Sequence, residues 1–99
     1  MATVAEITER IRDGLEGEAG LNRSLKIDFK GEGFIHVAGT EVTNDDAPAD
    51  CTVLISREDL EAMARGQLDP MQAMMRGRLR IQGDMAVAMK LQTLLRARG

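Results

Sequence analysis

The chain has 99 residues, which is enough for one domain but not for two, and its apolar fraction of 43% can supply one modest core. Its formal net charge of −3 and its two aromatic residues, Phe29 and Phe34, argue against nucleic-acid binding, which uses basic surfaces and stacked aromatic rings. No apolar run reaches the length of about 18 residues that a membrane-spanning helix needs.

Cellular location is indicated by the cysteine count and the two ends of the chain. Cys51 is the only cysteine, so no internal disulfide can form, as is typical of a reducing compartment. The N-terminal sequence lacks the apolar core of a secretory signal, and the C-terminal sequence "RARG" is not a peroxisomal address. We therefore expect a cytoplasmic protein whose single domain covers residues 1–99.

The first predicted element is an amphipathic helix. Thr3 and Glu6 have the spacing of a capping box, and glycines at 14, 17 and 20 end the helix. One helical face is apolar and holds Val4, Ile7, Ile11 and Leu15.

Three strands are expected next. Residues 25–30 and 34–39 form two strand-like runs around a glycine-rich turn, which predicts a β-hairpin. Residues 40–50 read as a polar turn region, with a weak edge strand around Val42. Residues 51–56 form the third clear strand, in which Cys51, Val53 and Ile55 face one way.

The second half is mainly helical. Ser56 is expected to cap one helix that ends at Gly66, and Asp69 to cap a second, short helix that ends at Gly77. Residues 78–82 alternate as a strand, and Asp84 caps the final helix. The predicted order is α-β-β-β-α-α-β-α. This order favours an α+β fold with a mainly antiparallel sheet of four to five strands covered on one face by helices.

Motifs for catalysis and cofactor binding are absent from the sequence. His36 is the only histidine and alternates within a strand, so it and Cys51 form no recognisable nucleophile pair. Neither residue has metal-ligand spacing, and the glycines match no nucleotide-binding pattern. We therefore expect no catalytic residue, no metal, no cofactor and no enzymatic activity.

Methionine replaces the missing aromatic residues. Six of the seven methionines lie between Met63 and Met89, and the helix predicted near the C-terminus is apolar around most of its surface. One interpretation is a tight core filled by methionine, and the other is an unfilled interior with adaptable walls for an apolar guest. Residues 51–99 also carry eight basic and five acidic side chains, which fits either a solvated surface or a site for anionic lipid or an acidic partner.

A dense motif runs from Asp50 to Leu95 and consists of Asp50-Cys51-Thr52, Asp59, Gly66, Leu68-Asp69-Pro70, Ala73, Gly77-Arg78, Arg80-Ile81, Gly83-Asp84-Met85 and Ala88-Met89-Lys90-Leu91. This motif resembles the sterol carrier protein-2 family of non-specific lipid-transfer domains. The chain departs from the family pattern at Met74-Met75, where an aromatic pair is common, and in having arginines where lysines are common. The first departure, Met74-Met75, alters the expected shape and softness of the pocket wall.

The resemblance implies a curved sheet and covering helices that enclose an apolar, lipid-sized tunnel. It also implies intracellular binding and transfer of lipids such as fatty acids, acyl-CoA, isoprenoids or sterol-like molecules, without catalysis. Helix and strand spacing then selects the candidate wall residues, which are Met74, Met75, Ile81, Met85, Met89, Leu91 and Leu94. The candidate contacts for an anionic head group are Arg76, Arg78 and Arg80.

Two alternatives lead to different functions. The apolar helices would serve as a protein-interaction or dimerisation module if the interior were filled, with a homodimer as one form. An enzyme of thioesterase or isomerase type would need a nucleophile or base, and the sequence offers none in a recognisable setting. A transient contact with a membrane surface is compatible with the lipid-transfer hypothesis.

Overall fold

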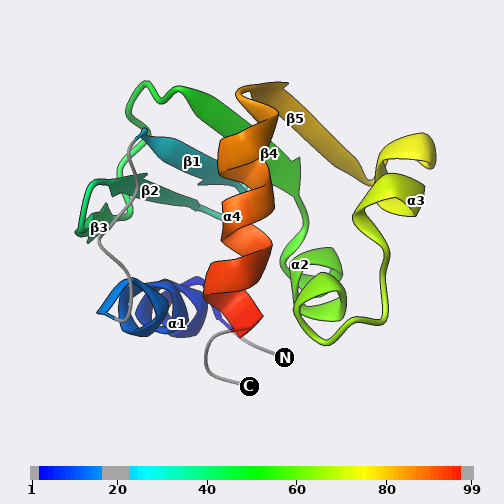
Figure 1. Cartoon of the computed structure of the whole chain (residues 1–99), viewed down its shortest axis with the longest axis horizontal. Coiled ribbons are helices and arrows are strands. Elements are labelled where there is room, and N and C mark those ends of the chain that lie inside the picture. Colours follow the sequence, from blue (N-terminus) through cyan, green and yellow to red (C-terminus); the bar gives the residue numbers. More distant parts are fainter. Residues whose placement is uncertain (1–2, 17–22, 97–99) are drawn as a thin grey trace.

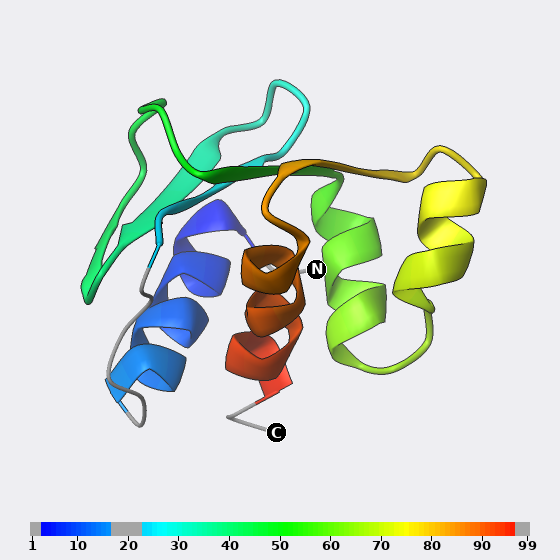
Figure 2. The ribbon, with the colours of Figure 1, turned by 45° about the horizontal axis from the view of Figure 1, so that its top comes forward.

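A five-stranded sheet and four helices form two layers in the computed structural model, which describes residues 3–16 and 23–96, with side-chain surroundings for 3–15 and 23–91. Figures 1 and 2 show the helices together on one face of the sheet, with α4 between α1 and α2 and with α3 at the far edge. The elements are α1 (Val4–Glu16), β1 (Leu25–Asp28), β2 (Phe34–Ala38), β3 (Glu41–Thr43), β4 (Cys51–Ile55), α2 (Arg57–Ala64), α3 (Pro70–Met75), β5 (Leu79–Gly83) and α4 (Met85–Arg96).

The sheet is open and mixed, with strand order β3-β2-β1-β4-β5. Leu25 of β1 pairs with Val37 of the antiparallel β2 and, on its other side, with Cys51 of the parallel β4. The remaining pairs, β2 with β3 and β4 with β5, are antiparallel. The prediction of a mainly antiparallel α+β fold is therefore confirmed, and the weak strand expected around Val42 is the edge strand β3.

The core lies between the sheet and the helices because the strands alternate as their sequences predict. In β1 and β4 every second side chain is buried, and these side chains share one core with Ile7, Ile11 and Leu15 of α1 and with Val87 and Leu91 of α4. Phe29 is the largest fully buried side chain. No helix within the described residues is both long enough and apolar enough to cross a bilayer.

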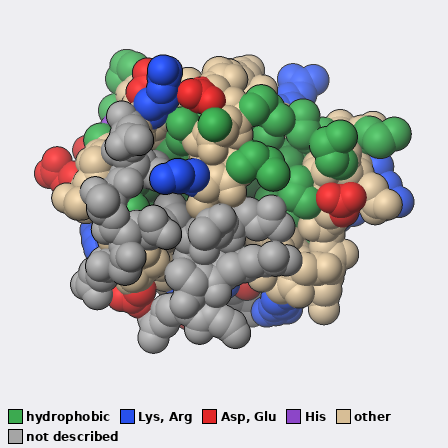
Figure 3. All heavy atoms as spheres, viewed as in Figure 1, with side chains coloured by type: hydrophobic (Ala, Val, Ile, Leu, Met, Phe, Trp, Pro, Cys, Tyr) green, Lys and Arg blue, Asp and Glu red, His purple; other side chains and the backbone are tan. Residues whose placement is uncertain are grey.

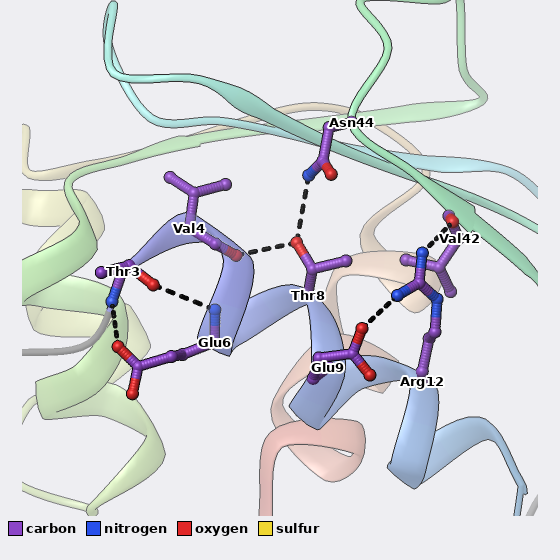
Figure 4. A network of polar contacts seen from close by, with 8 residues as sticks. All are labelled: Thr3, Val4, Glu6, Thr8, Glu9, Arg12, Val42 and Asn44. Atoms are coloured by element: carbon purple, nitrogen blue, oxygen red, sulfur yellow. Dashed lines mark hydrogen bonds and ion pairs between the residues drawn. The ribbon is translucent and has the colours of Figure 1, made fainter.

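The start of α1 carries the predicted capping box. The backbone N–H of Glu6 donates to Thr3 Oγ1 over 3.1 Å, and the backbone N–H of Thr3 donates to Glu6 Oε1 over 3.0 Å. One turn later, Thr8 donates its hydroxyl to the Val4 carbonyl and accepts a hydrogen bond from the Asn44 side chain (Figure 4). Arg12, which forms an ion pair with Glu9, also donates to the carbonyl of Val42 over 2.9 Å. These contacts fasten α1 to β3 and the loop after it.

The three remaining predicted caps are also present. Ser56 accepts a hydrogen bond from the backbone N–H of Asp59 at the start of α2, and Asp69 accepts one from Met71 at the start of α3. Asp84 accepts one from the backbone N–H of Ala86 in α4. Each helix of the second half therefore begins where its short polar residue predicts.

Gly83 allows two chain segments to approach closely at the end of β5. A Cβ atom at this position would lie 2.1 Å from the Asp50 carbonyl oxygen, and the backbone has φ of +104°. Both features require glycine. The same Asp50 accepts hydrogen bonds from Ser24, so β1, β4 and β5 are joined at this corner.

Candidate functional site

An apolar pocket lies between the β4–β5 edge of the sheet and α2, α3 and α4. The volume of this cavity is about 20 Å³, which is room for about one water molecule. Sites for small organic ligands usually occupy about 300 Å³ or more, so the pocket is nearly closed. Its lining residues are all apolar: Val53, Met63, Pro70, Leu79, Ile81, Ala88, Met89 and Leu91.

The pocket has a rigid floor and a softer mouth. Val53, Leu79 and Leu91 are each at most 3% exposed, so they belong to the packed core. Met89, in contrast, is 53% exposed although it lines the same pocket. An unbranched side chain half in water can change rotamer at little cost, so the mouth at Met89 can widen more easily than the floor.

Three of the predicted wall residues, Ile81, Met89 and Leu91, are brought together in this pocket. Met74, Met75 and Met85 are not among its lining residues, and Met75 is 84% exposed. Figure 3 shows hydrophobic side chains gathered on the surface from the upper part of α4 across to α3. Leu94 is in α4, but its side chain lies outside the described residues.

The three candidate arginines differ in their surroundings. Arg78 donates two hydrogen bonds to the buried carboxylate of Asp59, one of 2.6 Å from Nη2 and one of 3.3 Å from Nε. This bidentate pair joins the start of β5 to α2 and borders a polar cleft beside α2. Arg76 and Arg80 are exposed, and neither forms an ion pair with an acidic side chain in residues 3–15 or 23–91.

The surroundings of Cys51 and His36 indicate structural roles for both residues. Cys51 is buried, and burial first and the charge of Asp84 second raise the pKa of its thiol, which disfavours the reactive thiolate. His36 Nε2 lies 3.1 Å from the Pro48 carbonyl oxygen. Within the described part of the chain, no three histidine, cysteine or carboxylate side chains are grouped to hold a metal ion.

Comparison with known proteins places this chain in a family. The model of the SCP-2 sterol transfer family matches residues 2–96. The chain belongs to this family. Sterol carrier protein 2 of the rabbit, Oryctolagus cuniculus, is 37% identical over 79 residues, which are 80% of this chain and 14% of the rabbit protein. The chain thus spans only about one seventh of that relative.

A second relative and one solved structure match along most of their length. Non-specific lipid-transfer protein-like 1 of Caenorhabditis elegans is 31% identical over 101 residues, covering 96% of this chain and 80% of the relative. Sterol Carrier Protein-2 of Aedes aegypti, solved in complex with the C16 fatty acid palmitate, superposes with a TM-score of 0.73 and covers 98% of each chain at 15% identity. At that identity the structural match establishes the SCP-2 fold alone.

Five residues lining the pocket of this SCP-2 domain were not selected from the sequence. Leu79 shares its strand face with Ile81, so the alternation in β5 contains the signal for it. Val53 pairs with Ile81 across the sheet, a contact that depends on a register between strands far apart in the chain. The other three are Met63, Pro70 and Ala88.

Proposed function

We propose that this domain binds the hydrocarbon chain of a lipid in the pocket between β5, α3 and α4 and carries it through water. The observation that carries the proposal is a pocket with only apolar walls, one of which, Met89, is half exposed at the surface. Membership of a sterol transfer family and a fold shared with a palmitate-bound protein support it.

Helix α3 is the part of the wall most suited to move. It contains six residues, of which only Ala73 is buried, and it lies between Gly66 and Gly77, whose backbones rotate more freely than those of other residues. Pro70, its first residue, lines the pocket. A displacement of α3 away from α4 would enlarge the space without disturbing the sheet.

Apolar contact alone can supply useful affinity. Each buried methylene contributes about 0.8 kcal/mol and micromolar binding needs about 8 kcal/mol, so roughly ten methylenes suffice before the cost of opening is subtracted. Such contacts discriminate chain length and bulk only weakly, so we expect a broad range that includes fatty acids, acyl-CoA, isoprenoids and sterol-like lipids.

An anionic head group has two arginines available. Arg76 and Arg80 are exposed, whereas the guanidinium of Arg78 already binds Asp59. We infer that Arg76 or Arg80, rather than Arg78, meets a carboxylate or phosphate that remains in water while the chain is buried.

A cytoplasmic protein remains our expectation, because a single buried cysteine is typical of a reducing compartment.

Titration with a fluorescent fatty acid, followed by competition with palmitate, tests the proposal. Ala88→Leu adds three carbon atoms inside the pocket and should weaken binding at least fivefold, since the guest and the new side chain compete for space. Ala86→Leu is the matched control, because Ala86 is exposed on the same helix and does not line the pocket. Absence of saturable binding to wild type by any long-chain lipid would reject the function.

A non-catalytic interaction module is the second candidate. The narrowness of the pocket and the exposure of several methionines favour it, since a filled interior would leave the apolar surface for a partner or a second copy. Sedimentation at several protein concentrations separates the candidates. A mass that doubles with concentration, together with no lipid uptake, would support the interaction module.

A further inference from the structure

A group of exposed methionines covers more surface than the pocket requires. We call Met71, Met74 and Met75 of α3 together with Met85 and Met89 of α4 the methionine face. Their exposed fractions are 65%, 36%, 84%, 45% and 53%, respectively. Only Met89 also lines the pocket. Four long apolar side chains therefore remain in water, although a surface apolar patch of this kind usually marks an interaction site.

Helical spacing explains why the methionines form one face. In α3, positions 71, 74 and 75 lie on one side, opposite the buried Ala73. In α4, positions 85 and 89 are one turn apart, and the pocket places Met89 and Pro70, the first residue of α3, around the same space. The two stripes therefore lie on the helices that border the pocket, and Figure 3 shows hydrophobic side chains gathered on the surface between the upper part of α4 and α3.

The segment that carries the methionine face is positively charged. Residues 67–91 hold four basic side chains, Arg76, Arg78, Arg80 and Lys90, and two acidic ones, Asp69 and Asp84. Because Arg78 is paired with Asp59 of α2, the basic side chains available to an anionic partner are Arg76, Arg80 and Lys90. Both acidic residues accept helix-capping hydrogen bonds, and Asp84 also pairs with Arg23. Residues 3–15, which form most of α1, instead hold three acidic and two basic side chains. The charge therefore favours an anionic partner at the methionine face and not at α1.

We propose that the methionine face docks on a bilayer that contains anionic lipids. Flexible methionines enter the boundary between head groups and acyl chains, and the basic side chains meet the lipid phosphates. A bilayer fits better than a second copy, because pairing two such faces would bring like charges together. Docking would place Met89, at the pocket mouth, against the acyl chains. This use of the surface rests on the proposed lipid-carrier function, but docking itself is measurable without it.

Co-sedimentation with vesicles tests the docking, using phosphatidylcholine vesicles with and without phosphatidylglycerol. Wild type should bind the anionic vesicles more strongly. Met71→Gln keeps chain length and helix propensity but removes an apolar group outside the pocket, so binding should fall on the order of tenfold. Met71→Leu is the matched control and should bind like wild type.

A charge variant gives an independent measurement. Arg76→Gln should weaken binding to anionic vesicles about fivefold and leave binding to neutral vesicles unchanged. Lys30→Gln removes one positive charge from an exposed position in the β1–β2 turn and should have no such effect. Circular dichroism checks that each variant is folded.

Two results would overturn the docking proposal. One is Met71→Gln or Arg76→Gln binding anionic vesicles as tightly as wild type. The other is dimerisation through the methionine face. In that case dimers would form with increasing concentration, Met71→Gln would abolish them, and no variant would change vesicle binding. A fatty-acid titration in the absence of vesicles separates the two proposals, since Met71→Gln should retain pocket binding. If wild type bound no fatty acid, the carrier function would be rejected, and the vesicle measurements would still test the docking.

Discussion

Helices α1 and α3 are held to the same sheet in very different ways. Helix α1 buries Ile7, Ile11 and Leu15, carries a complete capping box and donates from Arg12 to β3. Helix α3 buries one alanine and exposes its three methionines. The first helix is fixed by packing and hydrogen bonds, whereas the second makes few contacts that would oppose its movement. The contacts that stabilise the fold are therefore concentrated at the α1 end of the molecule, and ligand entry is proposed at the α3 end.

The largest effect is expected in the core. Phe29→Ala should lower the free energy of unfolding by about 3–5 kcal/mol, because it removes the largest fully buried side chain and leaves a cavity. Urea denaturation measures this value. Phe34→Ala is a matched substitution at a half-buried site and should cost clearly less. Equal costs would show that the core does not concentrate stability as described.

A second large effect is expected at Gly83. Gly83→Ala places a Cβ 2.1 Å from the Asp50 carbonyl oxygen in a backbone with positive φ, so unfolding free energy should fall by about 2 kcal/mol or more. Gly31→Ala has a similar φ of +97° but no atom within 4 Å of the added Cβ. The control therefore isolates backbone strain. If Gly31→Ala loses less stability than Gly83→Ala in thermal denaturation, the difference between the two losses measures the clash with Asp50.

Acidification should weaken the same corner. The backbone N–H of Ser24 and then its hydroxyl donate to the carboxylate of Asp50 and lower the pKa of that carboxyl. The resulting stabilisation is complete above the unfolded value near 3.8 and is lost as pH falls through the lower folded pKa. Asp50→Asn should be less stable than wild type at neutral pH, and the gap should narrow in this acidic range. A gap in unfolding free energy that is independent of pH would contradict this account.

The smallest effect is expected on α3. Met75→Gln should change the free energy of unfolding by no more than about 0.5 kcal/mol, since the side chain is 84% exposed. Urea denaturation beside Phe29→Ala makes the comparison direct. A cost of several kcal/mol would mean that α3 is packed as firmly as α1.

Local signals in the sequence predicted most of the fold. The capping box at Thr3, the caps at Ser56 and Asp69 and the strand alternation depend on neighbours a few residues away, so the element boundaries could be inferred. The weak strand around Val42 becomes β3 because it pairs with β2 at an edge. The parallel pairing of β1 with β4 joins distant segments, and no local sequence pattern predicts this pairing.

The site was less accessible to sequence reasoning. Spacing placed Met74, Met75 and Met85 on apolar helix faces, but the face that meets the sheet depends on how each helix is rotated in the fold. In α3, Ala73 turns toward the core, and Met74 and Met75 therefore lie outside the pocket. Met85, at the start of α4, is exposed and does not line the pocket either. The pairing of Arg78 with Asp59 joins β5 to α2 in the same non-local way.

Helix α3 buries a single small residue, and this has a consequence for how such carriers diversify. Mutations at its other positions escape the penalty that core changes incur, so its composition can drift while the scaffold keeps folding. New guest preferences could then arise from exchanging one short segment. Designers could exploit the same freedom by grafting alternative lids between Gly66 and Gly77 onto an unchanged sheet.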